Sequence, residues 1–296
     1  MKVVIDTDPG TDDAIALVAA LNSPRLDILG LTTVGGNARL SHTTRNALRI
    51  LEFMGRQDIP VYPGSSRPLK GRFEYAYGFH GPGGLTVRLP LPKTEAQAGS
   101  AVDFIIESAR ANRRDLTLIA LGPLTNVAKA LKREPRIVEW LHEIVVMGGA
   151  LDVPGNVTPH AEFNIFDDPE AAKLVFDSDA SIRLIGLDVC RKAEVTRADE
   201  DWFRGDSQGE RLVSRIITGW LKMRGRDEAY NLCDPLAVAA AIRPDLFTFA
   251  RGNVSVETDD SSRRGKTSAG YGTGNVIVAT DVQAGEAKAF LRSMFT

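Results

Sequence analysis

Residues 2–34 of the chain, KVVIDTDPGTDDAIALVAALNSPRLDILGLTTV, combine two short apolar runs with a longer apolar stretch between them. Residues 2–6 and 26–34 are continuous apolar runs, which predicts strands that are buried on both faces. Residues 12–22 are apolar on nearly all sides, which predicts a buried helix. Because a strand, a helix and a strand in this order form a parallel pair, the segment predicts an α/β fold.

The same alternation of strand-like and helix-like segments continues along the rest of the chain. Further strands are expected over residues 59–62, 116–121, 143–147, 182–187, 254–258 and 276–279, and further helices over 42–54, 101–110, 126–133, 169–176, 209–223, 235–242 and 281–294. The charged stretch 258–265 is expected to form a loop. We therefore expect one domain, residues 1–296, with a single open, mostly parallel, doubly wound sheet of the Rossmann-like kind and helices on both faces.

The composition limits the classes of function. The chain has 296 residues, with 36 Lys and Arg against 38 Asp and Glu, a formal net charge of −2. This balance gives no electrostatic case for binding nucleic acid or an anionic membrane. No uncharged run reaches about 18 residues and the first residues do not form a signal peptide, so neither a transmembrane helix nor export is expected. Cys190 and Cys233 are expected to be reduced thiols in a cytoplasmic protein.

Four aspartates lie within residues 6–13 (DTDPGTDD), directly after the first expected strand. Pro9 and Gly10 predict a tight turn that lets the carboxylates converge. An aspartate in a first helical turn is also a common cap, so Asp12 or Asp13 alone fits a cap and a functional site equally well. Four carboxylates exceed what a cap needs, and they repel one another unless a cation neutralises them. Oxygen donors alone indicate a hard cation, Ca²⁺ or Mg²⁺.

Two connecting segments, residues 63–99 and 148–168, are longer than plain connections between helices and strands. Loops of this length in a compact domain are usually binding loops or lids. Both follow an expected strand, and ligands of open α/β sheets bind beyond the carboxyl ends of the strands. Asp234 before Pro235 fits a helix cap when it is considered alone, and it could equally add a carboxylate to a site.

Several motifs together resemble the nucleoside hydrolases, a family of Ca²⁺-dependent N-ribohydrolases. The likeness begins at residues 6–13 and runs in family order over about residues 2–240. The further blocks are Gly35-Gly36-Asn37, His80-Gly81, residues 122–126 (GPLTN), Met147-Gly148-Gly149, Gly155-Asn156, residues 161–166 (AEFNIF), residues 168–172 (DPEAA), Gly186-Leu187-Asp188 and Asp234-Pro235. Each block alone is weak, but their joint order and spacing are highly specific.

The resemblance implies one Ca²⁺ at the carboxyl edge of the sheet. Asp8, Asp13 and Asp234 resemble the carboxylate ligands, and the main-chain carbonyl of Leu121 resembles a further ligand. Asp8 would also act as the general base toward water. Breaking an N-glycosidic bond develops positive charge on the ribose, which carboxylates and amide oxygens stabilise.

The resemblance also implies a set of substrate contacts. Asp12 would bind the ribose 2′-hydroxyl, Asn164 the 3′-hydroxyl, and Asn156 with Glu162 the 5′-hydroxyl, while Asn37 and Met147 would complete the ribose pocket. His80 matches a family position near the base. Phe163 could stack on a nucleobase or pack in the core, and the sequence favours neither.

Cys233 departs from the commonest family pattern, which has His before the late metal-binding Asp; a subset of the family is similar to this chain in having Cys. The thiol, with an unperturbed pKa of about 8.5, is a poorer proton donor than imidazolium at neutral pH. Protonation of the leaving base could therefore come from Cys233, from His80 or from solvent. We expect a limited contribution from Cys233.

The leading interpretation is thus a Ca²⁺-dependent ribonucleoside hydrolase that acts on a small molecule and assembles as a homodimer or homotetramer. A metal-dependent phosphohydrolase is the first alternative, although the nearest basic candidates by sequence, Arg39, Arg72 and Arg226, stand outside every motif. A non-catalytic sugar or nucleoside binder is the second alternative, which Cys233 makes plausible and the intact carboxylate set disfavours. The sequence does not identify the preferred nucleobase.

Overall fold

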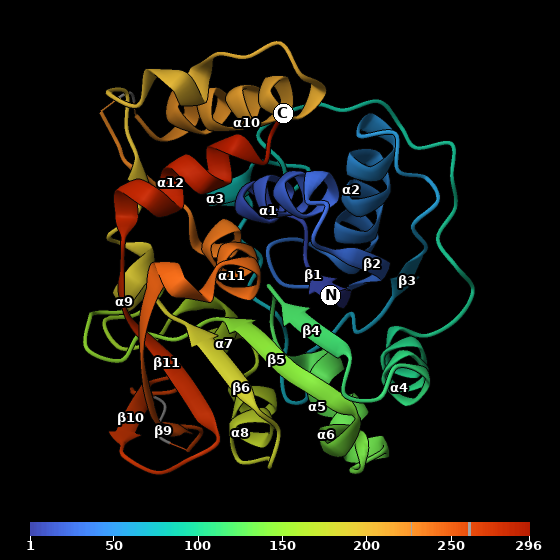
Figure 1. Ribbon diagram of the computed structural model, residues 1–296, viewed down its shortest axis with the longest axis vertical. Coiled ribbons are helices and arrows are strands. Elements are labelled where there is room, and N and C mark those ends of the chain that lie inside the picture. The colour runs from blue at the N-terminus through green and yellow to red at the C-terminus, as the bar shows by residue number, and fades with distance from the viewer. Residues whose placement is uncertain (226, 260–261) are drawn as a thin grey trace.

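A nine-stranded sheet crosses the computed structural model, which describes residues 1–225, 227–259 and 262–296 (Figure 1). In spatial order its strands are β10 (Thr267–Tyr271), β9 (Phe247–Val256), β11 (Val276–Val282), β6 (Ile182–Ile185), β5 (Leu141–Met147), β4 (Leu116–Ala120), β1 (Lys2–Thr7), β2 (Asp27–Thr33) and β3 (Val61–Pro63). A separate small sheet pairs β7 (Glu194–Val195) with β8 (Tyr230–Asn231).

Most neighbours in the large sheet are parallel. β1 pairs in parallel with β2 and with β4, and the parallel pairing continues outward to β3 on one side and through β5 and β6 to β11 on the other. Only β9 is antiparallel to its two neighbours, β10 and β11, within the described strands of this sheet. The prediction of a mostly parallel α/β sheet is confirmed. The order changes direction between β1 and β4, and a crevice opens at such a point beyond the carboxyl ends of the strands.

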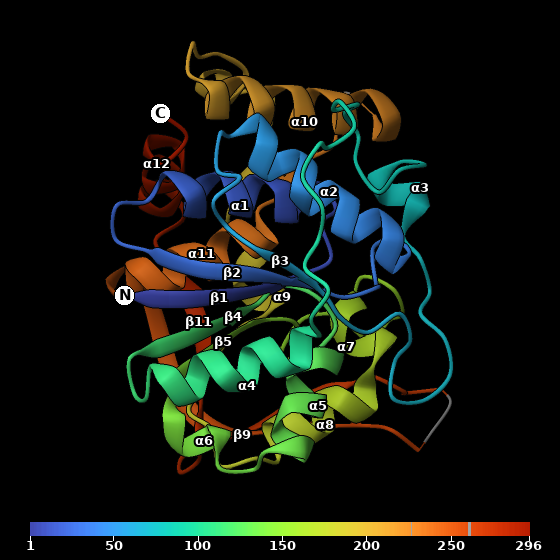
Figure 2. The same ribbon diagram turned by 90° about the vertical axis from the view of Figure 1, so that its right-hand side faces the viewer.

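Helices cover both faces of the sheet (Figure 2). One face carries α1 (Thr11–Asn22), α2 (Leu40–Phe53), α10 (Gln208–Arg224), α11 (Cys233–Ile242) and α12 (Ala284–Ser293). The other face carries α4 (Ala101–Ala111), α5 (Thr125–Arg133), α6 (Ile137–Trp140) and α8 (Pro169–Phe176). Shorter helices are α3 (Tyr77–His80), α7 (Phe163–Asp167) and α9 (Leu187–Cys190), with 3₁₀ turns over Glu200–Phe203 and Pro244–Leu246. Within the described ranges, none of these helices has the length and apolar character needed to cross a membrane.

The strands have continuous apolar sequences because helices cover the sheet on both faces. Val3 and Ile5 of β1 belong to the core beneath α1 and α11, while Val4 belongs to the core beneath α5 and α8. Successive side chains of a strand point to opposite faces, so a strand that is covered on both faces is apolar over most of its length, as Val3, Val4 and Ile5 are in β1. β1 therefore lies at the centre of the molecule, and the residues that follow it start from a rigid support.

The C-terminal part differs from the sequence expectations. The strand expected over 254–258 begins earlier, at Phe247, and the helix expected over 281–294 begins only at Ala284, because Asp281 and Val282 still pair within β11. β10, whose sequence is TSAGY, was missed because it contains small residues with weak strand preference. The loop expected over 258–265 lies between β9 and β10, and its residues 260 and 261 lie outside the described residues.

The long segment between β3 and α4 is anchored to the rest of the fold by one buried carboxylate. Asp168 is fully buried and caps α8, since its Oδ1 accepts from Ala171 N at 3.1 Å. Its Oδ2 accepts from Thr125 Oγ1 at 2.6 Å and from Leu69 N at 2.8 Å. Asp168 thus joins α8, the start of α5 and the long segment. The segment is a structured part of the fold at this point.

We predict that Asp168→Ala lowers the free energy of unfolding by at least about 2 kcal/mol, because it removes a helix cap and leaves the buried Thr125 hydroxyl and the partly buried Leu69 amide without their partner. Urea unfolding of the purified protein measures this value. Lys173→Ala on the same helix is the control, since its ion pair with Asp177 is half exposed and contributes less than about 1 kcal/mol. Equal unfolding curves for the two variants would contradict the anchoring role.

Candidate functional site

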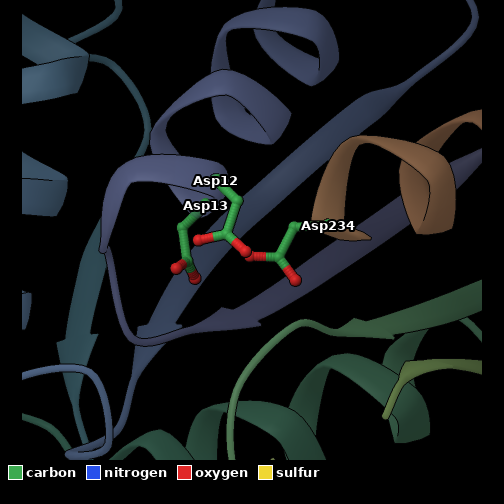
Figure 3. Close-up of side chains that lie close together, drawn as sticks. All are labelled: Asp12, Asp13 and Asp234. Atoms are coloured by element: carbon green, nitrogen blue, oxygen red, sulfur yellow. The ribbon is translucent and has the colours of Figure 1, made fainter. Parts of the chain in front are cut away.

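The site is built where β1 ends and α1 begins. After Thr7 the chain turns through Pro9 and Gly10 and enters α1 at Thr11. Asp12 and Asp13 lie in the first turn of α1, and Asp234 lies in the first turn of α11, which packs beside α1. The three side chains point toward one another (Figure 3). One oxygen from each carboxylate lies within 4.8 Å of the other two.

Asp13 has both of the roles that its sequence position allows. Its Oδ2 accepts from Gly10 N at 2.9 Å, which caps α1, and from Asn37 Nδ2 at 2.9 Å. Its Oδ1 accepts from Thr7 Oγ1 at 2.5 Å and from Asp8 N at 3.2 Å. These contacts fix the turn after β1. Asp13 is therefore a cap and a member of the carboxylate cluster at once.

The Asp8 carboxylate lies in a space that exists only because two neighbouring residues are glycines. Its Oδ2 accepts from Asn37 N at 2.6 Å, and its Oδ1 has no hydrogen-bond partner among the described residues. A Cβ atom at Gly36 would lie 2.2 Å from Asp8 Oδ2, and one at Gly122 would lie 2.5 Å from Asp8 Oδ1. The glycine motifs after β2 and β4 thus leave room for this one carboxylate.

The carboxylates in the cluster raise the pKa values of one another. Burial, and then repulsion from Asp13, raises the pKa of Asp12 to about 7. The same two causes raise the pKa of Asp8 well above its ordinary value, and burial followed by repulsion from Asp12 does so for Asp234. Burial raises the pKa of Asp13 as well. In the part of the chain that the structure describes, no Lys or Arg forms an ion pair with any of these four residues.

These observations fit a bound cation. Asp8 Oδ1 and Asp12 Oδ1 are buried and lack a hydrogen-bond partner within the described ranges. Burying several unpaired carboxylates is costly unless a positive charge compensates them, and the donor atoms are all oxygens, which suits a hard divalent ion. The compact group of three oxygens comes from Asp12, Asp13 and Asp234, whereas the sequence assigned Asp8 rather than Asp12 to the ligand set.

The predicted carbonyl ligand lies at the end of β4. The Leu121 carbonyl accepts from Asn164 Nδ2 at 2.7 Å, and the same amide nitrogen lies 3.3 Å from both the carbonyl oxygen and Sδ of Met147. Asn164 therefore bridges the ends of β4 and β5 at the floor of the site. A carbonyl oxygen has two lone pairs, so the contact with Asn164 leaves one of them for a cation.

A cavity of about 530 Å³ opens above the carboxylates. Nearly all predicted site residues line it, from β1–α1, the segment before α4, the ends of β4 and β5, α7 and α11. They are Asp12, Asn37, His80, Leu121, Met147, Asn156, Glu162, Phe163, Asn164, Cys233 and Asp234. Asp8 and Asp13 are fully buried and lie outside this lining set. Phe163, which the sequence left between core and pocket, lies in the pocket wall.

Glu162 is held by main-chain amides. Its Oε1 accepts from Asn164 N at 2.9 Å, and its Oε2 accepts from Gly149 N at 3.0 Å and Ile165 N at 3.1 Å. It therefore caps α7 while its carboxylate lines the cavity. Asn156 Oδ1 accepts from Phe163 N at 2.9 Å, which fastens the 148–168 segment to the same helix start.

His80 supports the start of α1. Its Nδ1 accepts from Thr11 N at 3.0 Å and lies 2.8 Å from Thr11 Oγ1. The accepting role of Nδ1 places the proton of a neutral ring on Nε2. Burial lowers the pKa of His80 to about 3, so the imidazole is neutral at physiological pH. A neutral ring is a weak acid, which lessens the case for His80 as the proton donor.

Cys233 is the first residue of α11 and lines the cavity. Interaction with the nearby Cys190 side chain, followed by burial, raises the pKa of Cys233 well above the ordinary value. The carboxylates Asp12 and Glu162 act in the same direction. A helix start favours thiolate, but here the surrounding groups outweigh it. The group at this position is therefore a protonated thiol.

Sequence reasoning missed two arginines in the cavity wall. Arg191 follows α9, and its Nη2 donates to the Gly155 carbonyl at 3.0 Å. Arg224 ends α10, and its guanidinium lies 5.6 Å from the ring centre of Phe79. Neither stands in a recognisable motif, so only the fold could reveal them. Of the basic candidates named from sequence, Arg39 and Arg72 are outside the lining set, and Arg226 lies outside the described residues.

Comparisons with known proteins agree on one family. The family profile described as "Inosine-uridine preferring nucleoside hydrolase" matches residues 3–289. Uridine nucleosidase 1 of Arabidopsis thaliana is 42% identical over 266 residues, which cover 87% of this chain and 78% of the relative. Two solved structures superpose with a TM-score of 0.93 and cover 100% of this chain and 98% of theirs. They are a plant nucleoside hydrolase (PpNRh1), at 36% identity, and a purine-preferring ribonucleoside hydrolase from Gardnerella vaginalis, at 32%.

The raised carboxylate pKa values predict how stability depends on pH. In cation-free protein the folded state keeps protons that the unfolded chain releases above about pH 4. The free energy of unfolding should therefore fall between pH 4 and about pH 7, where the pKa of Asp12 lies. Millimolar Ca²⁺ should restore about 2–4 kcal/mol at pH 8.

Urea unfolding at pH 5 and pH 8, with chelator or with Ca²⁺, tests this prediction. Asp234→Asn should abolish most of the gain from Ca²⁺, because it removes one carboxylate from the cluster. Glu228→Gln changes a cavity residue outside the cluster and should keep the gain. A wild-type protein whose stability is the same with chelator and with Ca²⁺ at pH 8 would refute the cation site.

Proposed function

This chain belongs to the inosine-uridine preferring nucleoside hydrolase family, and we propose that it hydrolyses the N-glycosidic bond of ribonucleosides, releasing ribose and the free base with the help of Ca²⁺. The observation that carries the proposal is the cluster of buried carboxylates at the floor of a cavity of about 530 Å³. The cavity has the size of a small-molecule site, and its polar groups converge on one end.

Ca²⁺ is the proposed ion because it accepts six to eight oxygen ligands in flexible geometry, whereas Mg²⁺ demands a near-ideal octahedron. Asp8, Asp13 and Asp234 would hold it together with the Leu121 carbonyl, and Asp12 lies close enough to contribute. When bound, the ion would supply Lewis-acid activation of water and a fixed partner for sugar hydroxyls. The other roles in the proposed reaction fall to side chains of the protein.

Asp8 is the proposed general base. Its Oδ1 is buried and has no hydrogen-bond partner in the described part of the chain, so one oxygen is available to accept a proton from the attacking water. Burial and the neighbouring carboxylates raise the pKa of Asp8, which brings its basicity closer to neutrality. The Asn37 main-chain amide holds the other oxygen and fixes the direction of the carboxylate.

The same cluster would stabilise the sugar as it becomes positively charged. Loss of the base gives the ribose oxocarbenium character, and the carboxylates of Asp12 and Glu162 line the cavity in fixed positions. We propose that Asp12 binds the 2′-hydroxyl, Asn164 the 3′-hydroxyl, and Asn156 with Glu162 the 5′-hydroxyl. Asn37 and Met147 complete the ribose end. Fixed partners of this kind position the sugar against the nucleophile.

The base would lie against the aromatic part of the cavity wall, to which Phe79, Trp220 and Phe163 contribute. Uridine is our proposed substrate, because the relative named for uridine is 42% identical, against 32% for the purine-preferring structure. A panel of inosine, adenosine, guanosine, uridine and cytidine, with release of reducing sugar as the readout, tests the reaction and the preference together. Release from none of the five in the presence of Ca²⁺ would refute the proposed function.

The ribose contacts predict strong discrimination against deoxy sugars. A site that is built to hydrogen-bond a hydroxyl leaves buried polar groups unpaired when that hydroxyl is missing. We predict that kcat/KM on 2′-deoxyuridine is at least about 100-fold lower than on uridine. Arabinouridine, which keeps the hydroxyl in the opposite configuration, serves as a size-matched control and should also be poor. Comparable activity on uridine and 2′-deoxyuridine would contradict the assignment of Asp12.

A last prediction separates the two possible roles of Cys233. A protonated thiol with a raised pKa donates its proton poorly, so we expect Cys233 to shape the cavity more than to act as the acid. Cys233→Ala and Cys233→Ser should each lose less than about 10-fold in kcat on uridine. The loss should be similar on p-nitrophenyl riboside, whose leaving group needs no proton. A loss of more than about 100-fold on the nucleoside alone would identify the thiol as the acid.

A further inference from the structure

The chain has two cysteines, and the fold brings them together. Cys190 ends α9 and Cys233 begins α11, and these two helices pack against each other. Both cysteines are free thiols, and beside them Leu232 N donates to the Ala193 carbonyl at 3.4 Å, which holds the two helix ends together. Cys190 has no role in the proposed reaction.

The two thiols differ in how they can be reached. Cys233 lines the cavity and keeps 8% of its surface exposed, whereas Cys190 is fully buried behind it. A small reagent that enters the cavity therefore meets Cys233 first. Cys190 can react only with a group that Cys233 already carries, or with Cys233 itself.

We propose that Cys190 and Cys233 form a reversible intramolecular disulfide that turns the enzyme off. With a peroxide as the two-electron oxidant, the Cys233 thiol gives up its proton and the sulfur attacks the O–O bond; the proton joins the displaced hydroxide, giving a sulfenic acid and one molecule of water. Only the thiolate attacks, and the raised pKa makes it the minor form at neutral pH, so this first step is the slow one. The Cys190 sulfur then displaces the sulfenic oxygen, which leaves with both protons as a second water. Overall, two thiols and one hydrogen peroxide give one disulfide and two waters.

The surroundings favour closure over further oxidation. A disulfide needs its two Cα atoms within about 7 Å and its sulfurs at about 2.05 Å. Cysteines at the adjoining ends of two packed helices, which the Leu232–Ala193 main-chain hydrogen bond joins, need little backbone movement to meet this requirement. Because the second thiol lies directly behind the first, it traps a sulfenic acid before more oxidant arrives. The expected product is the disulfide rather than a sulfinic acid.

The disulfide would act on the site through α11. Cys233 directly precedes Asp234, whose carboxylate belongs to the cluster. A covalent tie to α9 draws the Cys233 sulfur away from the cavity and constrains the first turn of α11, which carries Asp234. Displacement of a site group by about 1 Å can cost about 100-fold in rate. The loss of activity rests on the proposed function, whereas formation of the disulfide does not.

The experiment treats the full-length Ca²⁺-loaded protein with diamide, which oxidises two thiols to a disulfide and is itself reduced to a hydrazine. Intact mass should fall by about 2 Da, and thiol labelling after denaturation should find no free thiol where untreated protein has both. Proteolysis should yield one peptide pair joined through Cys190 and Cys233. Activity on the best nucleoside should fall at least 10-fold and return with dithiothreitol.

Cys190→Ala and Cys190→Ser are the matched controls. Each keeps Cys233 in the cavity but cannot close the disulfide, so activity before treatment should stay within about threefold of wild type and should survive diamide. Using both variants guards against a packing defect caused by either substitution. Excess uridine should slow the oxidation of wild type, because it occupies the cavity through which diamide reaches Cys233.

Two results would overturn the proposal. One is a folded wild-type protein that keeps both thiols free after prolonged treatment. The other is inactivation of both Cys190 variants at the wild-type rate, which would assign the loss of activity to Cys233 alone. A protein that forms the disulfide but hydrolyses no nucleoside before treatment would refute the proposed function and leave the disulfide established.

Discussion

The structure depends on placing several carboxylates together in its interior. Asp8, Asp13 and Asp234 are almost completely buried, and repulsion within the cluster adds to burial in raising the pKa of Asp8 and Asp234. A fold tolerates such a group when a cation compensates it, or when protons do so at lower pH. Apolar β1 supplies the rigid support beneath the cluster, and helix starts bring main-chain amides to it. A cation that completed the cluster would thus also be a structural component and would couple stability to the proposed catalysis.

The main chain around the cluster is shaped to fit one residue. Asp8 lies between the loops after β2 and β4, and a side chain at Gly36 or Gly122 would clash with its oxygens. Asn37 then holds Asp8 through its main-chain amide and Asp13 through its side chain. The geometry of these carboxylates is therefore set by contacts with residues outside the cluster, an arrangement that is common in metal sites. This explains why glycine motifs far from the aspartates in sequence belong to the same site.

The sequence predicted the parts of the fold that repeat a simple pattern. Apolar runs located β1 to β6, since strands covered on both faces carry that pattern over most of their length. The sequence failed at β10, whose sequence of small residues carries no strand signal, and at the start of α12. In the site, motif blocks singled out Asp12, Asp13 and Asp234, and the fold brings these three carboxylates together; their roles remain predictions. Arg191 and the proximity of Cys190 and Cys233 could not be predicted, because only the packing of α9 in the fold brings Arg191 to the cavity and Cys190 close to the start of α11.

Different parts of the cavity wall are supported by different kinds of structure. The floor is formed where strands end, at Leu121 after β4 and Met147 in β5, and at the first turn of α1. The sheet fixes the positions of these groups. Other parts of the cavity wall come from the connecting segment that holds Phe79 in α3 and from Arg224, the last residue of α10. Such segments can change without cost to the core. A family on this scaffold can therefore accept different bases while the chemistry at the ribose stays constant.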